Sequence, residues 1–240
     1  MKCAGRTETG LRRQNEDCYL ILDTESLHAV AVSDGMGGHR AGETASATAV
    51  QTLFDQLSAG TGSWEGMLTK AFREANTVVH TLAQSDDSMY GMGCTLVAAI
   101  YDETHFVAAN VGDSRLYHFD GSSLRRITHD HSFVAELVRR GIITEEEAKT
   151  HPRRNIITRA IGTESRVASD IFPCEWKQGD MLLLCSDGLC GVLSDEETAA
   201  YLRNSVDLDA TCAALISRAL QLGSRDNITV VLVRNDGGNA

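Results

Sequence analysis

Short runs of hydrophobic residues, each bounded by turn-forming residues, recur along the chain and predict β-strands. Several of these runs alternate with polar residues, whereas others are apolar throughout. Continuous apolar runs of this length are consistent with strands that are buried on both faces. The predicted strands are 18–22, 28–32, 95–101, 106–111, 115–119, 181–185 and 228–233.

A second pattern, with apolar residues at three- and four-residue spacing, predicts amphipathic helices. Ser63 is the expected N-cap of one of them, and Gly141 and Gly223 are expected to end two others. Thr144 with Glu147, and Ser194 with Glu197, match the capping-box pattern. The predicted helices cover 43–57, 63–82, 132–140 and 208–222, with further helical turns after Thr144 and Ser194.

The order of these elements favours an α+β fold. Strands predominate early and late in the chain, with paired helices between them, and strict strand-helix alternation is missing from the sequence. This order is typical of antiparallel sheets covered by helices and not of a doubly wound parallel sheet. No repeat, low-complexity tract or proline-rich linker divides residues 1–240, so we expect one domain.

Composition describes an ordinary globular protein with an excess of acid. Of the 240 residues, 42% are hydrophobic, and 22 basic against 33 acidic residues give a formal net charge of −11. This charge disfavours a nucleic-acid partner, because a phosphate backbone is also negative. Excess carboxylate is instead suited to divalent cations.

The sequence also predicts where the protein resides. The longest apolar stretch, 96–101, is far shorter than the roughly 20 residues that cross a bilayer, so no membrane span is expected. The first residues turn polar at once, unlike a signal peptide. Seven cysteines without a C-x-x-C pair suit free thiols in a reducing compartment. We therefore expect a cytoplasmic protein.

Four aspartates stand at the ends of predicted strands, which is the most informative chemical feature of the chain. Small residues flank each of Asp34, Asp113, Asp187 and Asp226, and neighbouring glycines let backbone oxygens approach a cation. Hard oxygen ligands of this kind are suited to magnesium or manganese. The alternative is an ordinary Asp-Gly turn, which is our interpretation of Asp120 and its following glycine.

A second charged cluster lies near the start of the chain. Arg12 precedes Asn15, Glu16 and Asp17, directly before the strand predicted at 18–22. An arginine fork beside carboxylates is typical of a phosphate-binding, metal-bearing site. Taken alone, the same pattern also fits a charged surface turn.

Other reaction classes are excluded because their motifs are missing. The sequence contains no Walker-type phosphate loop, G-x-S-x-G elbow, H-E-x-x-H helix or complete EF-hand loop. Cys212 and Arg218 have the spacing of a cysteine-dependent phosphatase, but the residues between them are apolar and lie on a predicted helix stripe. We therefore interpret that segment as a core helix.

Together, these segments resemble the successive motifs of one family, the metal-dependent type 2C (PPM) Ser/Thr protein phosphatases. The motifs are RRQNEDCY, AVAVSDGMGGHRAGETAS, GCTLVAA, NVGDSRLY, ITHDHSFVAELVRRGIITEEEAKTHPRRNIITRAIG, LLLCSDGL and SRDNITVVLV. They span about Thr7 to Val233 in the family's order, and DGMGGH resembles its bacterial members. The resemblance implies an α-β-β-α sandwich of two antiparallel sheets flanked by helices, with a binuclear Mg²⁺ or Mn²⁺ centre at one end.

The resemblance also implies roles for individual residues. Asp34 matches the carboxylate that bridges two metals, and the carbonyl of Gly35 matches a ligand of one of them. The remaining acids match as follows: Asp187 and Asp226 are ligands of the other metal, Glu16 lies near the first metal with Asp17 supporting it, and Asp113 is a ligand of a weaker third metal. Arg12 matches the arginine that grips the substrate phosphate.

The implied activity is hydrolysis of phosphoserine and phosphothreonine by a metal-activated water, without a covalent intermediate. Met36 stands where many eukaryotic relatives have a histidine. The general acid is therefore either His39 or a metal-bound water. Residues 132–163 match a mobile flap. Basic residues from Lys149 to Arg159 either steer the substrate there or are simply solvated.

These expectations leave alternatives. The implied partners are phosphorylated proteins, targets of a cognate Ser/Thr kinase, and we expect a monomer. A metal-binding or interaction module without turnover would be favoured by a lost ligand, but all the motif acids are present. Hydrolysis of small phosphate esters is a third possibility.

Overall fold

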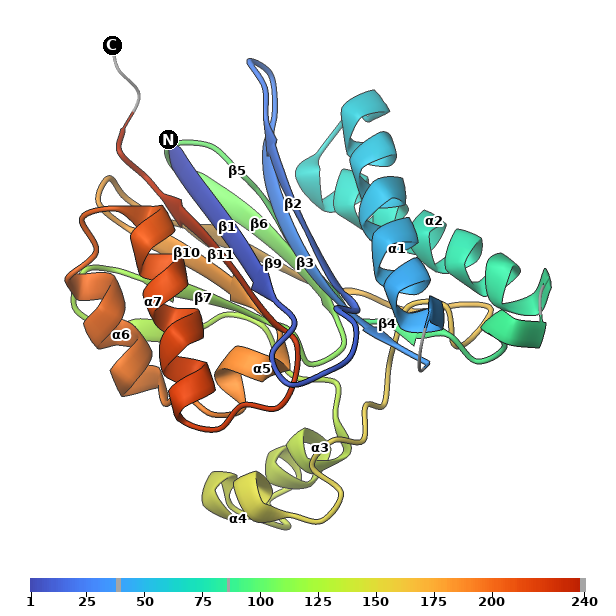
Figure 1. Ribbon diagram of the computed structural model, residues 1–240. Coiled ribbons are helices and arrows are strands. Elements are labelled where there is room, and N and C mark those ends of the chain that lie inside the picture. Colours follow the sequence, from blue (N-terminus) through green and yellow to red (C-terminus); the bar gives the residue numbers. More distant parts are fainter. Residues whose placement is uncertain (38–39, 86, 238–240) are drawn as a thin grey trace.

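Two antiparallel β-sheets stacked face to face form the centre of the molecule, and helices cover both outer faces (Figure 1). The computed structural model describes residues 1–37, 40–85 and 87–237. The first sheet has the order β1 (Lys2–Glu8), β11 (Ile228–Arg234), β10 (Met181–Cys185), β7 (Arg115–Phe119) and β8 (Leu124–Arg126). The second has the order β2 (Asp17–Asp23), β3 (His28–Met36), β5 (Leu96–Tyr101), β6 (His105–Val111) and β9 (Asp170–Glu175), with β4 (Gly93–Cys94) paired to β3.

The helices form the two outer layers. Against the second sheet lie α1 (Arg40–Ala59) and α2 (Trp64–Ser85), followed by the short 3₁₀ turn η1 (Asp87–Met89). Against the first sheet lie α5 (Asp187–Cys190), α6 (Asp195–Arg203) and α7 (Leu208–Gln221). The layer order is therefore α-β-β-α, which confirms the predicted fold class.

The central strands are buried on both faces, which explains why several of them are apolar throughout. In β3, Ala29 and Ala31 pack toward α1 and α2, whereas Val30 and Val32 point into the layer between the sheets. In β10, Leu183 faces the helices of the other side and Leu182 faces the inter-sheet layer. Full burial of one such side chain contributes roughly 1.5–3 kcal/mol, so these strands fix the frame that carries the loops.

The predicted helices and strands are all present, and four strands were missed. The seven predicted strands correspond to β2, β3, β5, β6, β7, β10 and β11. The missed strands are β1, β4, β8 and β9. The turn expected at Asp120 joins β7 to β8, where the Asp120 amide donates to the Ser123 carbonyl and Gly121 has a φ of 86°.

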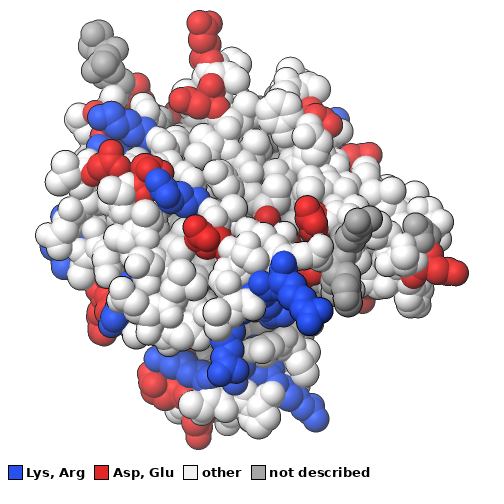
Figure 2. All heavy atoms as spheres, in the orientation of Figure 1, with Lys and Arg blue, Asp and Glu red and all other residues white. Residues whose placement is uncertain are grey.

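The helices α3 (Phe133–Arg139) and α4 (Glu145–Thr150) lie apart from the sheets, below the end of the sandwich in Figure 1. Ser132 caps α3, and Thr144 caps α4 with the predicted capping box through Glu147. Lys and Arg side chains gather over this lower part of the molecule (Figure 2). Within the described ranges, we find no helix long and apolar enough to cross a membrane.

Candidate metal centre

Carboxylates from both sheets meet at one end of the sandwich. Asp34 lies near the end of β3, directly opposite Asp17 at the start of β2. Asp187 begins α5 directly after β10, and Asp226 precedes β11 in the other sheet. Asp113 follows β6. Because antiparallel neighbours alternate in direction, strand starts and strand ends meet at the same edge, which brings these five residues together.

Asp34 is the most deeply enclosed member of this carboxylate cluster (Asp17, Asp34, Asp113, Asp187 and Asp226). Its backbone amide donates to Thr95 Oγ1 at 2.9 Å, and the Thr95 amide donates to the Asp34 carbonyl at 2.8 Å. These two bonds fix the backbone of Asp34. Burial, followed by repulsion from the four neighbouring carboxylates, raises the pKa of Asp34 well above its ordinary value. Such repulsion among carboxylates is relieved when protons or cations enter the cluster.

Asp17 and Asp187 each contribute a buried oxygen without a hydrogen-bond partner among the described residues, Asp17 Oδ1 and Asp187 Oδ1. The other oxygen of Asp17 accepts hydrogen bonds from Ser186 Oγ at 2.8 Å and Thr229 Oγ1 at 2.7 Å. Burial raises the pKa of Asp17 to about 7 despite these bonds. Burial and Asp226 also raise the pKa of Asp187, which shares a side-chain hydrogen bond with Asp34.

Asp113 joins the cluster from the loop between β6 and β7. Burial, then repulsion from Asp187 and Asp130, raises its pKa to about 7. The preceding Gly112 has a φ of 108°, and a Cβ there would lie 2.6 Å from the Thr95 side chain. Only glycine fits this close approach, so the loop that carries Asp113 is anchored against the same threonine that holds Asp34.

Gly35 and Glu16 are packed together beside Asp34. The Gly35 amide donates to the Glu16 carbonyl at 3.0 Å. A Cβ at Gly35 would lie 2.1 Å from the Gly42 carbonyl oxygen, and one at Gly42 would lie 2.6 Å from Glu16 Oε2. The glycine-rich segment thus lets the Glu16 carboxylate approach the start of α1, close to the carboxylate cluster.

Arg12 lies at the rim of the cluster. Its Nη2 donates to Asp226 Oδ2 at 2.7 Å, and 59% of its side chain is exposed. The hydrogen bond to Asp226, and then the Coulombic attraction of that carboxylate, raise the pKa of Arg12. One side of the guanidinium is therefore anchored while the rest faces solvent.

Asn227 is a buried residue that sequence reasoning did not single out. Its Oδ1 accepts from the Glu16 amide at 2.8 Å, and its Nδ2 donates to the carbonyls of Thr9 and Gln14, each at 2.9 Å. These three bonds hold the loop that carries Arg12 to the start of β11. Its place in the segment SRDN, next to Asp226, was the only sequence signal.

The donor chemistry fits a hard divalent cation, although no three His, Cys, Asp or Glu side chains in the described ranges already form a coordination shell. The cluster offers carboxylate oxygens only, two of them buried without partners.

His39, the candidate general acid, lies outside the described residues. Cys212 is fully buried in the α7 core and Arg218 pairs with Glu197, which confirms the interpretation of that segment as a core helix.

A carboxylate cluster beside an exposed arginine, at one end of an α-β-β-α sandwich, fits the class of phosphate-ester hydrolases. Comparison with known proteins is more specific. Residues 5–223 match the family model described as protein phosphatase 2C. The chain therefore belongs to the protein phosphatase 2C family and is a phosphatase, which confirms the family and the enzyme class that the sequence predicted.

Named relatives and solved structures agree with this assignment. The serine/threonine phosphatase stp of Listeria monocytogenes is 42% identical over 238 residues, covering 96% of this chain and 94% of its own. The crystal structure of serine/threonine phosphatase Stp1 from Staphylococcus aureus superposes with a TM-score of 0.92 at 37% identity, covering 98% of this chain and 95% of that one. The catalytic domain of PstP with two manganese ions superposes with a TM-score of 0.86 at 34% identity, and the match covers 96% of each chain.

Proposed function

We propose that this chain removes phosphate from phosphoserine and phosphothreonine in proteins, using two Mn²⁺ or Mg²⁺ ions held by the carboxylate cluster. The observation that carries this proposal is the meeting of five carboxylates with one anchored, exposed arginine at the end of the sandwich. We propose that Asp34 would hold both ions and that the Gly35 carbonyl would hold the first. Asp187 and Asp226 are the proposed ligands of the second metal.

When bound, the two ions supply a water of lowered pKa as nucleophile and positive charge for the transition state. The chain's own residues hold the carboxylates in place. Thr95 fixes Asp34, and Ser186 and Thr229 fix Asp17, so that the carboxylates keep their places despite mutual repulsion. Glu16 is the proposed acidic residue near the first metal, with Asp17 supporting it.

Arg12 is the proposed phosphate-binding residue. The ion pair with Asp226 orients the planar, permanently charged guanidinium of Arg12 toward the space beside the cluster. Two parallel hydrogen bonds from such a fork orient the phosphoryl oxygens for attack from the opposite side. A proton donor must then assist the serine or threonine alkoxide as it leaves, since its high pKa makes unassisted departure slow. His39 remains our candidate for that donor.

Asp113 is the proposed ligand of a weaker third ion, shared with Asp187. We further propose that α3, α4 and the residues to Thr163 form a flap over the substrate. Lys149 pairs with Glu146 and Arg159 with Asp170, whereas Arg154 is exposed. The expected setting is a cytoplasmic monomer acting on targets of a cognate Ser/Thr kinase.

The decisive experiment measures phosphate release from a phosphothreonine peptide by the purified chain, with Mn²⁺, with Mg²⁺ and with EDTA. Turnover should require metal. Metal binding without any turnover would favour a binding module, and faster hydrolysis of sugar phosphates than of the peptide would favour small esters. Either result would overturn the proposal.

A further inference from the structure

Two cysteines flank the segment that carries Asp187. Cys185 is the last residue of β10, and Cys190 is the last residue of α5. Cys185 is fully buried, whereas Cys190 is half-buried at the edge of the core between β10 and α7. Ser186 and Asp187 therefore lie between two thiols that are separated by a single short helical turn.

The side chains of these cysteines turn toward each other. Cys190 Sγ donates to the Ser186 carbonyl at 3.6 Å, so it points back to the peptide unit that follows Cys185. The thiol of Cys190 contacts the thiol of Cys185, so the two sulfurs lie within reach of each other. Elsewhere, Cys94 and Cys212 donate to the backbone carbonyls of Ala45 and Ala4 instead.

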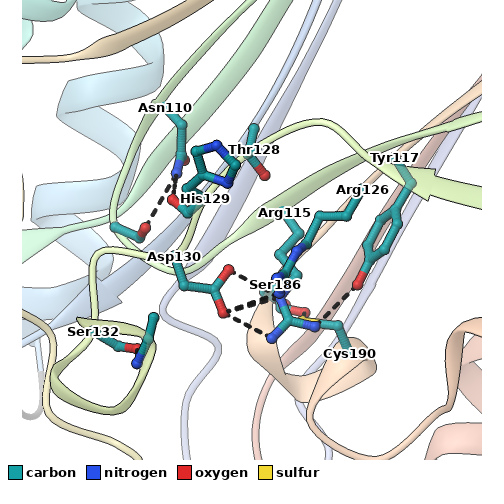
Figure 3. A network of polar contacts seen from close by, with 12 residues as sticks. Asn110, Arg115, Tyr117, Arg126, Thr128, His129, Asp130, Ser132, Ser186 and Cys190 are labelled. Carbon is teal, nitrogen blue, oxygen red and sulfur yellow. Dashed lines mark hydrogen bonds and ion pairs between the residues drawn. The ribbon is translucent and has the colours of Figure 1, made fainter. Parts of the chain in front are cut away.

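A buried cation stands beside this pair. Arg115 pairs with Cys185 in the register of β7 and β10, and Figure 3 shows its guanidinium next to Cys190. The guanidinium is fixed by Asp130, at 2.7 Å from Nη2, and by the Tyr117 hydroxyl, at 3.0 Å from Nη1. Burial opposes its charge, but Cys190, Asp130 and Tyr117 raise the pKa of Arg115. Of the two thiols beside this cation, that of Cys190 is the partly exposed one, so it is the one that an oxidant in solution can reach.

We propose that Cys185 and Cys190 form an oxidation site that closes to a disulfide with hydrogen peroxide. The Cys190 sulfur attacks one peroxide oxygen, the O–O bond breaks, and the leaving hydroxide takes up the Cys190 proton to become water. The Cys185 sulfur then attacks the sulfenic sulfur of Cys190, the S–O bond breaks, and a second water leaves with the Cys185 proton. Two thiols lose two electrons, and one peroxide is reduced to two waters.

Closing this bond acts on the carboxylate cluster. A disulfide holds its two Cα atoms about 4.4–6.8 Å apart with a fixed torsion, which constrains the one turn of α5. That turn carries Asp187, and the preceding Ser186 donates to Asp17. Oxidation should therefore displace Asp187 and lower turnover reversibly. This consequence rests on the proposed function, whereas the disulfide itself does not.

The experiment treats the reduced full-length chain with hydrogen peroxide and maps its peptides by mass spectrometry. We expect a Cys185–Cys190 crosslink, a mass decrease of about 2 Da per chain, and recovery with dithiothreitol. Cys190→Ser should keep the untreated turnover, form no crosslink and resist peroxide. Cys174→Ser, at a half-buried cysteine on the edge strand β9, should crosslink and lose activity like the parent chain.

Each failure has its own meaning. Sulfinic acid at Cys190 without a crosslink, or a crosslink to another cysteine, would overturn the oxidation site. A correct crosslink with unchanged turnover would overturn its coupling to Asp187. If the reduced chain itself hydrolysed no phosphopeptide while the crosslink formed, the proposed function would fail and the oxidation site would stand.

Discussion

Arg12 combines a fixed anchor with an exposed fork, and this geometry predicts how its loss acts. A guanidinium that contacts phosphate in both ground and transition states supplies mostly uniform binding, so Arg12→Ala should raise KM more than it lowers kcat. A charge-assisted bond contributes roughly 1.5–3 kcal/mol, so kcat/KM for a phosphopeptide should fall by about tenfold or more. Arg12→Lys should restore only part of it, because lysine lacks the planar fork.

The neighbouring Arg13 is the matched control for this variant. It carries the same charge on the same exposed loop but takes no part in the ion pair to Asp226. Steady-state kinetics of Arg13→Ala should remain near those of the parent chain. Equal damage from both variants, or an unaffected Arg12→Ala, would mean that another residue contacts the phosphate.

The three proposed core ligands should respond differently from Arg12. Asp34→Ala, Asp187→Ala and Asp226→Ala each remove a ligand, and we expect kcat losses above about 100-fold, since even outer supporting partners cost 10–100-fold. Circular dichroism should show a retained fold, because the hydrophobic layers and not the cluster hold the sheets together. Asp113→Ala should keep two tightly bound ions in a manganese titration while losing much activity. Near-normal metal affinity and turnover in any core variant would remove that residue from the ligand set.

At the scale of elements, Asn227 joins the β1–β2 loop to β11, and its loss should loosen that loop. Asn227→Ala removes the acceptor of the Glu16 amide and the donor to the carbonyls of Thr9 and Gln14, of which Thr9 keeps the bond from the Arg12 amide at 3.3 Å. A buried polar group without a partner costs about 1–3 kcal/mol, so urea unfolding should show a destabilisation of at least this size. Because Arg12 sits on the freed loop, KM for a phosphopeptide should also rise. An unchanged KM would show that Arg12 is positioned without this tie.

The elements that sequence patterns predicted are those whose own residues carry the signal. Strands such as β3 and β10 are apolar enough to be recognised alone, and the caps of α3 and α4 depend on local spacing. The missed β1, KCAGRTE, is polar and exists because all seven of its residues pair with β11. The missed β9 contains Pro173, which weakens a strand signal but is tolerated at a sheet edge. Pairing with distant strands decides these elements.

In the site, too, some residues carry a local sequence signal and others depend on contacts with distant parts of the chain. Asp34, Asp187 and Asp226 were recognisable because each stands beside a strongly apolar strand with small neighbours. The ion pair from Arg12 to Asp226 and the ties made by Asn227 join residues more than 200 positions apart. No local spacing encodes such contacts, since they arise only when β11 is placed between β1 and β10.

At the scale of the whole molecule, the carboxylate cluster makes the stability of the fold depend on pH. Burial raises the pKa of Asp17 and of Asp113 from 3.8 to about 7. Between these values the folded chain holds protons that the unfolded chain has released. The metal-free protein should therefore lose stability as pH rises from about 4 toward 7, since stability falls wherever the folded state binds more protons.

Metal ions should reverse this pH dependence, because they replace the protons in the cluster. We expect the Tm of the chelator-treated chain to fall between pH 5.5 and pH 7.5, and saturating Mn²⁺ to raise Tm more at pH 7.5 than at pH 5.5, as linkage requires of a ligand that binds only the folded state. Differential scanning calorimetry across this range measures both effects. Asp187→Asn is the control: with one charge removed, the metal-free Tm should depend less on pH and the Mn²⁺ shift should shrink. A Tm that rose with pH without metal, or a Mn²⁺ shift equal at both pH values, would contradict the account of the cluster as a set of protonated carboxylates that a cation neutralises.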